Sequence, residues 1–410
     1  CGDAIGKHHF DNLKLDYPAG EELEREMTGI KIYSPDIATA FSVEGEGLYG
    51  FIINRHLFGQ RLLRIAINAG ANLKESTQAL EPIVENHSLK GISAKDLLTG
   101  RRAKITSRVV VDASGLPAVL RTKLPPELRI DTATHKEDIV ICYREIRKLK
   151  EQIPEPNFCE IYLNRQHAPG GYSWIFPEGE TKVNVGLGVA TSGNPINPKN
   201  QLYTHILSRT LFGDSSILKG GGGQVPTRRP IDCMTGDGIV IVGDAACQVN
   251  PIHGGGIGPS MTGGVMAGKT IIKALDSDNV SRTGLWPYNV EYLKSYGARQ
   301  AGLDVFRLFL QGLSNDDLNF GMKYQLITES DLLKTSMGED IRLNLSEKTF
   351  RVFKGIRKVS LLKRLRKATS LIRKMREHYQ NYPTSPDSFN DWKRKTQHLA
   401  EEASKMRAPS

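Results

Sequence analysis

The sequence predicts an α/β fold that is interrupted by an antiparallel β-sheet and followed by a helical C-terminal region. Two β-branched runs, at residues 108–115 and 238–246, each end in turn residues that include an aspartate. Short alternating runs lie between them, and helical spacing of apolar residues dominates after about residue 290. This order is typical of a sheet domain that is inserted into a parallel α/β domain.

The composition is that of an ordinary folded protein. The chain has 410 residues, of which 39% are hydrophobic and 24% charged, so globally disordered and fibrous classes are excluded. Its uncharged apolar runs are far shorter than the roughly 20 residues of a membrane-spanning helix, and no signal peptide opens it. The five cysteines include no CxxC pair, which argues against a zinc site or a disulfide framework and favours a cytoplasmic location.

The two β-branched runs predict buried parallel strands. Asp112 ends the first strand and Asp244 the second, so both carboxylates are expected at the carboxyl edge of one sheet, where ligands bind in α/β folds. Residues 54–70 carry apolar side chains at helical spacing and close on Gly70, which predicts a helix.

Three short runs, at residues 160–163, 172–177 and 181–189, predict the inserted sheet. Tyr172 and Trp174 alternate onto one face with a third aromatic, Phe176. The pattern predicts a half-buried antiparallel sheet with one apolar face. Aromatic residues at this period are more often core than ligand wall.

The net charge of +10 is concentrated in one segment. Residues 348–376 hold twelve Lys and Arg and no Asp or Glu, so the rest of the chain carries −2. Apolar residues recur there at helical spacing: Val352, Ile356, Val359, Leu362, Leu365, Ile372 and Met375. A basic amphipathic helix favours docking on an anionic membrane, with shallow insertion of these side chains; a solvated helix face is the alternative. The few aromatics argue against nucleic acid.

The most specific motif is GDAACQVNPIHGGGIG, at residues 243–258. An aspartate at a strand end accepts hydrogen bonds from sugar hydroxyls, and glycines let backbone amides approach an anion or a flat ring. The stretch from Pro259 to Leu275 is helix-compatible after Gly264, so a positive helix end would face this loop. The chain's GxGxxG, at residues 45–50, leads into a β-like run and is interpreted as a hairpin turn.

Three motifs resemble one flavoprotein family. Residues 243–264 resemble the second flavin-binding motif of the p-hydroxybenzoate hydroxylase-like flavoproteins. YSWIFP at 172–177, followed by GLG at 186–188, resembles the substrate-site motif of geranylgeranyl reductases, and the opening CGDA resembles that family's turn beside the flavin. The similarity is closest to archaeal digeranylgeranylglycerophospholipid reductases.

The resemblance implies a domain plan. Residues 1–125 and 226–290 would form a Rossmann-like FAD-binding domain, residues 126–225 the substrate-binding sheet, and residues 291–410 a helical region. Family members begin with a strand, a glycine-rich turn, a helix and a second strand, which this sequence does not show before Cys1. The sequence is therefore interpreted as N-terminally truncated, with the first βαβ unit missing.

The resemblance also implies roles for single residues. Cys1 would stand at the flavin ring as a catalytic residue, with His8 and His9 as alternative proton donors. Tyr172 and Trp174 would line an apolar substrate tunnel, and no metal is implied. The residues implied to bind FAD are Cys1, Gly2, Ala4, Arg55, Ala79, Asp244 (on the ribityl chain), Gly256 and Ile257.

The implied activity is FAD-dependent saturation of C=C bonds in the geranylgeranyl chains of archaeal-type membrane glycerophospholipids or their precursors. Implied partners are the lipid substrate, an anionic membrane surface, and NAD(P)H or ferredoxin as electron donor. The expected location is cytoplasmic and peripheral to the membrane. Two alternatives stay open: an FAD-dependent monooxygenase of the same superfamily, and a non-enzymatic peripheral membrane-binding protein.

Overall fold

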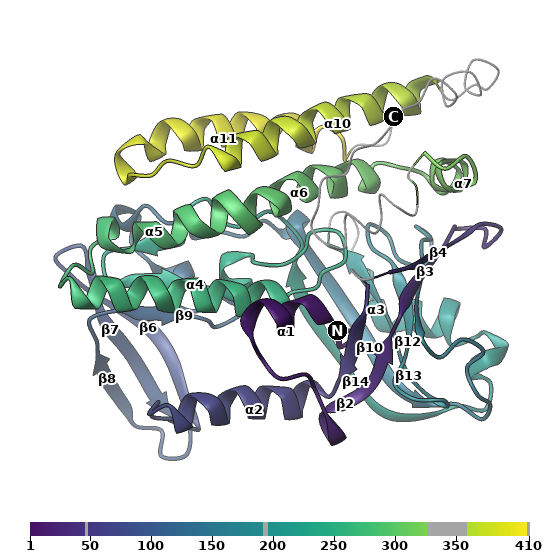
Figure 1. Cartoon of the computed structure of the whole chain (residues 1–410), viewed down its shortest axis with the longest axis horizontal. Helices are drawn as coiled ribbons and strands as arrows, with labels where there is room; N and C mark the ends of the chain where they lie inside the picture. Colours follow the sequence, from purple (N-terminus) through teal and green to yellow (C-terminus); the bar gives the residue numbers. More distant parts are fainter. Residues whose placement is uncertain (46–47, 192–195, 327, 329–358, 408–410) are drawn as a thin grey trace.

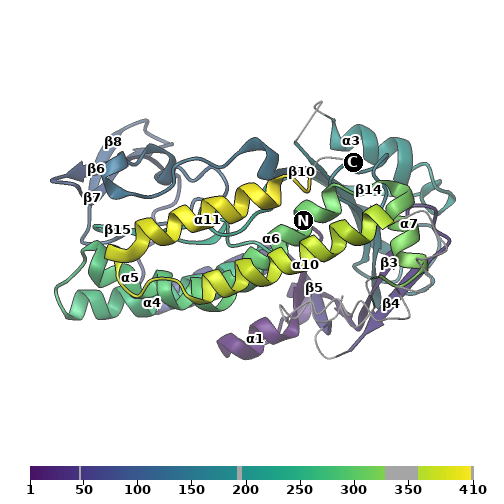
Figure 2. The same ribbon diagram turned by 90° about the horizontal axis from the view of Figure 1, so that it is seen from above.

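Most long helices lie along one side of the protein and the large β-sheet lies at one end (Figure 1). The computed structural model describes residues 1–410 except 46–47, 192–195, 327, 329–358 and 408–410. Figure 2 shows α10 (Val359–Gln380) and α11 (Phe389–Ser404) side by side as the outermost layer. The mixed α/β class predicted from the sequence is confirmed.

The two predicted parallel strands form the centre of the α/β part. β9 (Val110–Asp112) runs parallel to β16 (Ile239–Ile241), and β15 (Thr235–Gly236) pairs antiparallel with β16. All three residues of β16 are fully buried, beneath α4 (Ile257–Asp276) and α5 (Arg282–Tyr292). Asp112 lies opposite Ile241, so both strands end at the same edge, as predicted.

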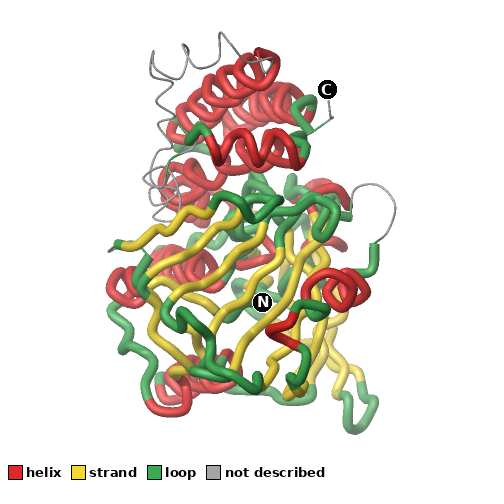
Figure 3. The backbone as a smooth tube through the Cα atoms, turned by 90° about the vertical axis from the view of Figure 1, so that its right-hand side faces the viewer, coloured by secondary structure: helices red, strands yellow, loops and turns green. Residues whose placement is uncertain are grey.

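A seven-stranded sheet forms the other end of the protein (Figure 3). All neighbours in it pair antiparallel except β11 and β3, which are parallel. The predicted antiparallel sheet is thus confirmed, and it also takes two strands from the first 44 residues. In spatial order the strands are β14 (Ser216–Pro226), β10 (Ile139–Lys148), β13 (Lys182–Ala190), β12 (Ser173–Pro177), β11 (Phe158–Tyr162), β3 (Gly29–Tyr33) and β4 (Ala40–Glu44).

The prediction of a single apolar face on this sheet is wrong, because both faces are covered. On one face, Val185 and Leu187 pack with the buried Leu202 of the π-helical turn η5 (Leu202–Ile206), which follows α3 (Pro198–Gln201). On the other face, Trp174 packs with Ile52. The alternation in the sequence does not show that the Trp174 face is also covered, because Ile52 comes from a distant strand.

Two smaller three-stranded sheets complete the N-terminal part. One has the order β1 (Ala4–Gly6), β5 (Gly50–Ile53), β2 (Leu23–Met27); the other has β6 (Thr77–Glu85), β7 (Ser88–Asp96), β8 (Arg102–Thr106). The remaining N-terminal helices are α1 (Lys7–Leu13) and α2 (Arg55–Asn68), the latter as predicted.

The hairpin predicted at residues 45–50 is wrong. The segment joins β4 to β5, which belong to different sheets. No helix follows it directly, so it is no dinucleotide fingerprint either.

The described part of the C-terminal region is helical, as predicted, but α10 buries most of its apolar face. Helix α10 belongs to the helices along one side of the protein (Figure 1). The same side holds α6 (Ala298–Gln311), α7 (Asn315–Lys323) and the π-helical turn η8 (Leu293–Gly297). Leu362, Leu365, Ile372 and Met375 are buried in the main core, so the predicted membrane insertion of these four side chains is wrong, whereas Val359 at the start of α10 is exposed. Val352 and Ile356 lie outside the described residues.

The outer face of α10 carries what we term the α10 cation row, a set of exposed basic side chains. Its members are Lys363, Arg366, Lys367, Arg373 and Lys374. Among the described residues, no helix combines the length and the apolar character needed to span a membrane. All five cysteines are free thiols.

Candidate active site

The N-terminal turn, Cys1–Asp3, is anchored to the large sheet by charge. The buried Asp3 side chain places Oδ2 3.1 Å from Arg144 Nη2 of β10 and Oδ1 4.0 Å from Arg55 Nε. A Cβ at Gly2 would lie 2.3 Å from the Phe176 ring, so this close approach requires glycine. Cys1 itself remains exposed.

The buried side-chain amide of Asn184 joins this turn to the aromatic wall of the sheet, which consists of Tyr172, Trp174 and Phe176. Asn184 Nδ2 of β13 lies 3.1 Å from the Cys1 carbonyl oxygen, 3.2 Å from Asp3 Oδ2 and 3.4 Å from Glu178 Oε1. Its Oδ1 accepts a hydrogen bond from Trp174 Nε1 at 3.0 Å. Sequence reasoning missed this residue, although a polar side chain inside the apolar run of β13 is a signal of a buried hydrogen-bonding group.

The aromatic wall also contacts the glycine-rich loop. The rings of Tyr172 and Trp174 lie 6.0 Å apart, and those of Trp174 and Phe176 lie 6.3 Å apart. The Tyr172 hydroxyl donates to the His253 carbonyl oxygen at 2.6 Å. The structure therefore brings the predicted substrate residues between the Cys1 turn and the loop predicted to hold the flavin.

The Asp244 side chain lies beside the start of helix α4, and we term residues 243–258, which hold both, the cradle. Helix α4 begins at Ile257, eight residues before the predicted start, with Gly256 as its N-cap. A Cβ at Gly256 would lie 3.0 Å from Asp244 Oδ1. No group among the described residues donates a hydrogen bond to the Asp244 carboxylate, and burial raises its pKa, an effect that Arg55 partly offsets. A carboxylate without protein donors beside a helix N-terminus fits the ribityl chain and ring of FAD.

The two predicted alternative proton donors lie close to this cradle. The His8 and His9 rings are 4.1 Å apart, and a Cβ at Gly258 would lie 2.1 Å from the His9 ring. Burial, helped by His8 and His253, lowers the pKa of His9 to about 3, and burial also lowers the pKa of His8. Both imidazoles are therefore neutral near neutral pH, and a neutral imidazole is a poor proton donor.

The remaining predicted residues are spread out. Arg55, the first residue of α2, lies near Asp3, as noted above, while Ala4 is exposed in β1. Ala79 lies in β6 opposite Ala94 of β7, in strands that Figure 1 places at the other end of the molecule from the large sheet. The structure does not bring Ala79 to the Cys1 turn.

The Asp112 carboxylate was expected to face a ligand at the edge of the sheet, but it accepts hydrogen bonds from its own loop instead. The carboxylate accepts N–H bonds from Ser114, Leu120 and Arg121 at 3.1, 3.2 and 2.8 Å. A carboxylate that backbone amides already saturate organises a loop rather than binding a ligand.

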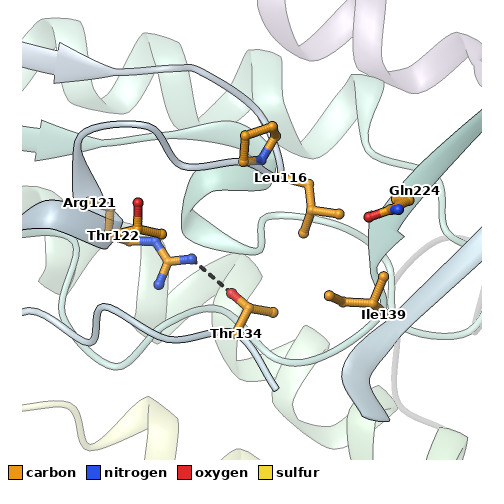
Figure 4. Close-up of a pocket in the computed structure, with 7 residues that line it drawn as sticks. Leu116, Arg121, Thr122, Thr134, Ile139 and Gln224 are labelled. Carbon is orange, nitrogen blue, oxygen red and sulfur yellow. Dashed lines mark hydrogen bonds between the residues drawn. The ribbon is translucent and has the colours of Figure 1, made fainter. Parts of the chain in front are cut away.

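A separate cavity of about 600 Å³ lies between this loop and the large sheet (Figure 4). The buried Arg121 at its wall donates to the Asp131 carbonyl oxygen at 2.6 Å and to Thr134 Oγ1 at 2.8 Å. None of its lining residues belongs to the predicted site. They are Leu116, Pro117, Arg121, Thr122, Thr134, Ile139 and Gln224.

Solved structures resemble this fold. A geranylgeranyl bacteriochlorophyll reductase-like protein from Thermoplasma acidophilum matches with a TM-score of 0.74 and 21% identity, over 90% of this chain and 89% of that chain. A flavin-dependent brominase matches with a TM-score of 0.57 and 18% identity, over 81% and 79%. At these identities the matches show the fold alone.

Sequence comparisons identify the family. A family model described as the geranylgeranyl reductase catalytic domain matches residues 138–225. A digeranylgeranylglycerophospholipid reductase of Sulfolobus acidocaldarius is 42% identical over 407 residues, 99% of this chain and 89% of the relative. Another from Methanothrix thermoacetophila is 32% identical over 78% of this chain and 79% of the relative. The resemblance inferred from the motifs is confirmed: the chain belongs to the digeranylgeranylglycerophospholipid reductase family.

Proposed function

We propose that this protein reduces C=C bonds in the geranylgeranyl chains of archaeal-type membrane glycerophospholipids, with FAD as cofactor. One observation carries the proposal most directly. The aromatic wall of Tyr172 and Trp174 is hydrogen-bonded on one side to the glycine-rich loop and on the other to Asn184, which also holds the Cys1 turn. The names of the relatives point to the same substrate class.

The cofactor residues follow from the cradle. We assign Asp244 to the ribityl hydroxyls, and Gly256 and Ile257 to the ring and the adjoining phosphate, because backbone amides at the start of α4 face this loop. Gly2 and Ala4 would border the ring from the Cys1 turn, and Arg55 would add a positive charge. The domain boundaries given above are part of this proposal.

Reduction of an alkene requires the site to deliver both a hydride and a proton to one double bond. An isolated alkene has no carbonyl group to polarise, so a hydride must reach one carbon while a proton reaches its neighbour. FAD, once reduced and bound, supplies the hydride. We assign the proton to the Cys1 thiol, since the alternative donors His8 and His9 are neutral near neutral pH. The aromatic wall would keep water away from the geranylgeranyl chain of the lipid and hold its double bond in place.

A lipid substrate requires access to a membrane. We propose that the α10 cation row contacts an anionic membrane surface on the cytoplasmic side, through charge alone, since the apolar face of α10 is buried. NAD(P)H or ferredoxin would return electrons to the flavin.

Reduction of defined lipid tests the proposal. The purified protein is loaded with FAD, reduced chemically and mixed with digeranylgeranylglycerophospholipid in vesicles, and the lipid is analysed by mass spectrometry. We expect two added hydrogen atoms for each double bond. Consumption of oxygen with an oxygenated product would favour the monooxygenase instead. Binding to vesicles with no chemical change would favour the non-enzymatic alternative.

A further inference from the structure

We propose that Asn184 is a positioning residue, which holds the Trp174 wall and the Cys1 turn in register so that an alkene meets the thiol in a reactive geometry. The proposal rests on the roles assigned above to Trp174 and Cys1. It adds a residue that belongs neither to the three motifs nor to the predicted site.

The hydrogen bonds of Asn184 connect two segments that are far apart in the chain. Its Oδ1 accepts the indole N–H of Trp174 at 3.0 Å, and its Nδ2 lies 3.1 Å from the Cys1 carbonyl oxygen. The side chain is fully buried, so water cannot replace either bond. A single rigid amide therefore sets the distance between the wall and the turn.

The surrounding charges explain why an amide stands here. Asp3 Oδ2 and Glu178 Oε1 lie 3.2 and 3.4 Å from Nδ2, and both side chains are buried. Burial raises the pKa of Glu178, with Glu24 and Asp3 acting in the same direction and Lys182 opposing them. A third carboxylate would meet like charge and would lack the N–H that the Cys1 carbonyl requires.

Two substitutions separate positioning from plain core packing. Asn184→Leu fills similar space and removes every hydrogen bond. Asn184→Asp keeps the acceptor for Trp174, and its introduced carboxyl regains a donor only when it is protonated. The groups that bear on its ionisation are Asp3 of the N-terminal turn, Glu178 after β12, Arg144 of β10, Lys182 of β13, Glu24 of β2 and Arg55 of α2.

We expect both variants to bind FAD and to lose about tenfold or more in kcat near neutral pH, because an ångström of misplacement can cost about a hundredfold. The KM for lipid should change less. As the pH falls from about 8 to about 5, the Asn184→Asp variant should recover relative to the wild type, since burial beside two carboxyls raises the pKa of the introduced group. The Asn184→Leu variant should not recover.

The controls keep the outcomes distinct. Trp174→Phe keeps a ring but removes the indole N–H, so it should show a smaller loss of kcat with no recovery at low pH. If Asn184→Leu keeps the wild-type kcat, or if both Asn184 variants are impaired equally at every pH, the positioning role is refuted. Should the Leu variant fail to fold, the pH response of the Asp variant still decides. A wild-type protein that reduces no lipid would overturn the proposed function instead.

Discussion

The substitution Asp244→Ala should weaken FAD binding but should stabilise the FAD-free protein. In the cradle its carboxylate receives no hydrogen bond from the described residues, and the Cβ position of Gly256 lies 3.0 Å from Oδ1. Ribityl hydroxyls would supply the missing donors. A hydrogen bond to a charged group contributes about 1.5–3 kcal/mol, so Asp244→Ala should weaken FAD binding by roughly 10- to 150-fold.

The FAD-free protein should instead gain stability. Burial raises the pKa of Asp244 in the folded protein above the ordinary value of 3.8. The folded state therefore binds this proton more tightly than the unfolded chain, and stability falls as the pH rises through the window above 3.8. Asp244→Ala removes this loss, so the Tm of the FAD-free protein should rise at neutral pH, and the difference should fade toward acid.

Flavin titration and thermal melts at several pH values measure both effects. Asp214→Ala is a suitable control, because its carboxylate lies at the surface, 3.2 Å from an equally exposed lysine. It should change neither quantity. Unchanged FAD affinity in Asp244→Ala would refute the assignment of the ribityl chain to this carboxylate. A lower Tm of the FAD-free variant would refute the argument from burial.

Three further predictions concern catalysis and membrane contact. Cys1→Ala should retain FAD but lose most alkene reduction, measured by lipid mass spectrometry; normal turnover would remove the thiol from the mechanism. His9→Gln should leave the pH–rate profile unchanged above about pH 5, because a group with a pKa of about 3 is already neutral there, and a lost limb in that profile would contradict this. Neutral substitution of the α10 cation row should abolish co-sedimentation with anionic vesicles, and binding by the wild type should weaken as salt rises; equal binding to neutral vesicles would contradict a Coulombic contact.

The sequence alone determined the features that rest on local pattern. The β-branched runs ending in Asp112 and Asp244 predicted two parallel strands, and Asn54 capped the predicted helix α2 through its side chain. The order of the three motifs predicted the family. Each of these signals is contained within a short stretch of chain, where backbone preference and side-chain period act directly.

Only the tertiary structure decided which residues meet. The sequence favours membrane insertion for the apolar stripe of α10, but amphipathicity does not specify what covers the apolar face, and in the structure most of this stripe is buried in the main core. In the same way, Asn184 and Cys1 are 183 residues apart in sequence and share one hydrogen bond. Such contacts depend on sheet register and on the path of distant segments, which no local period encodes.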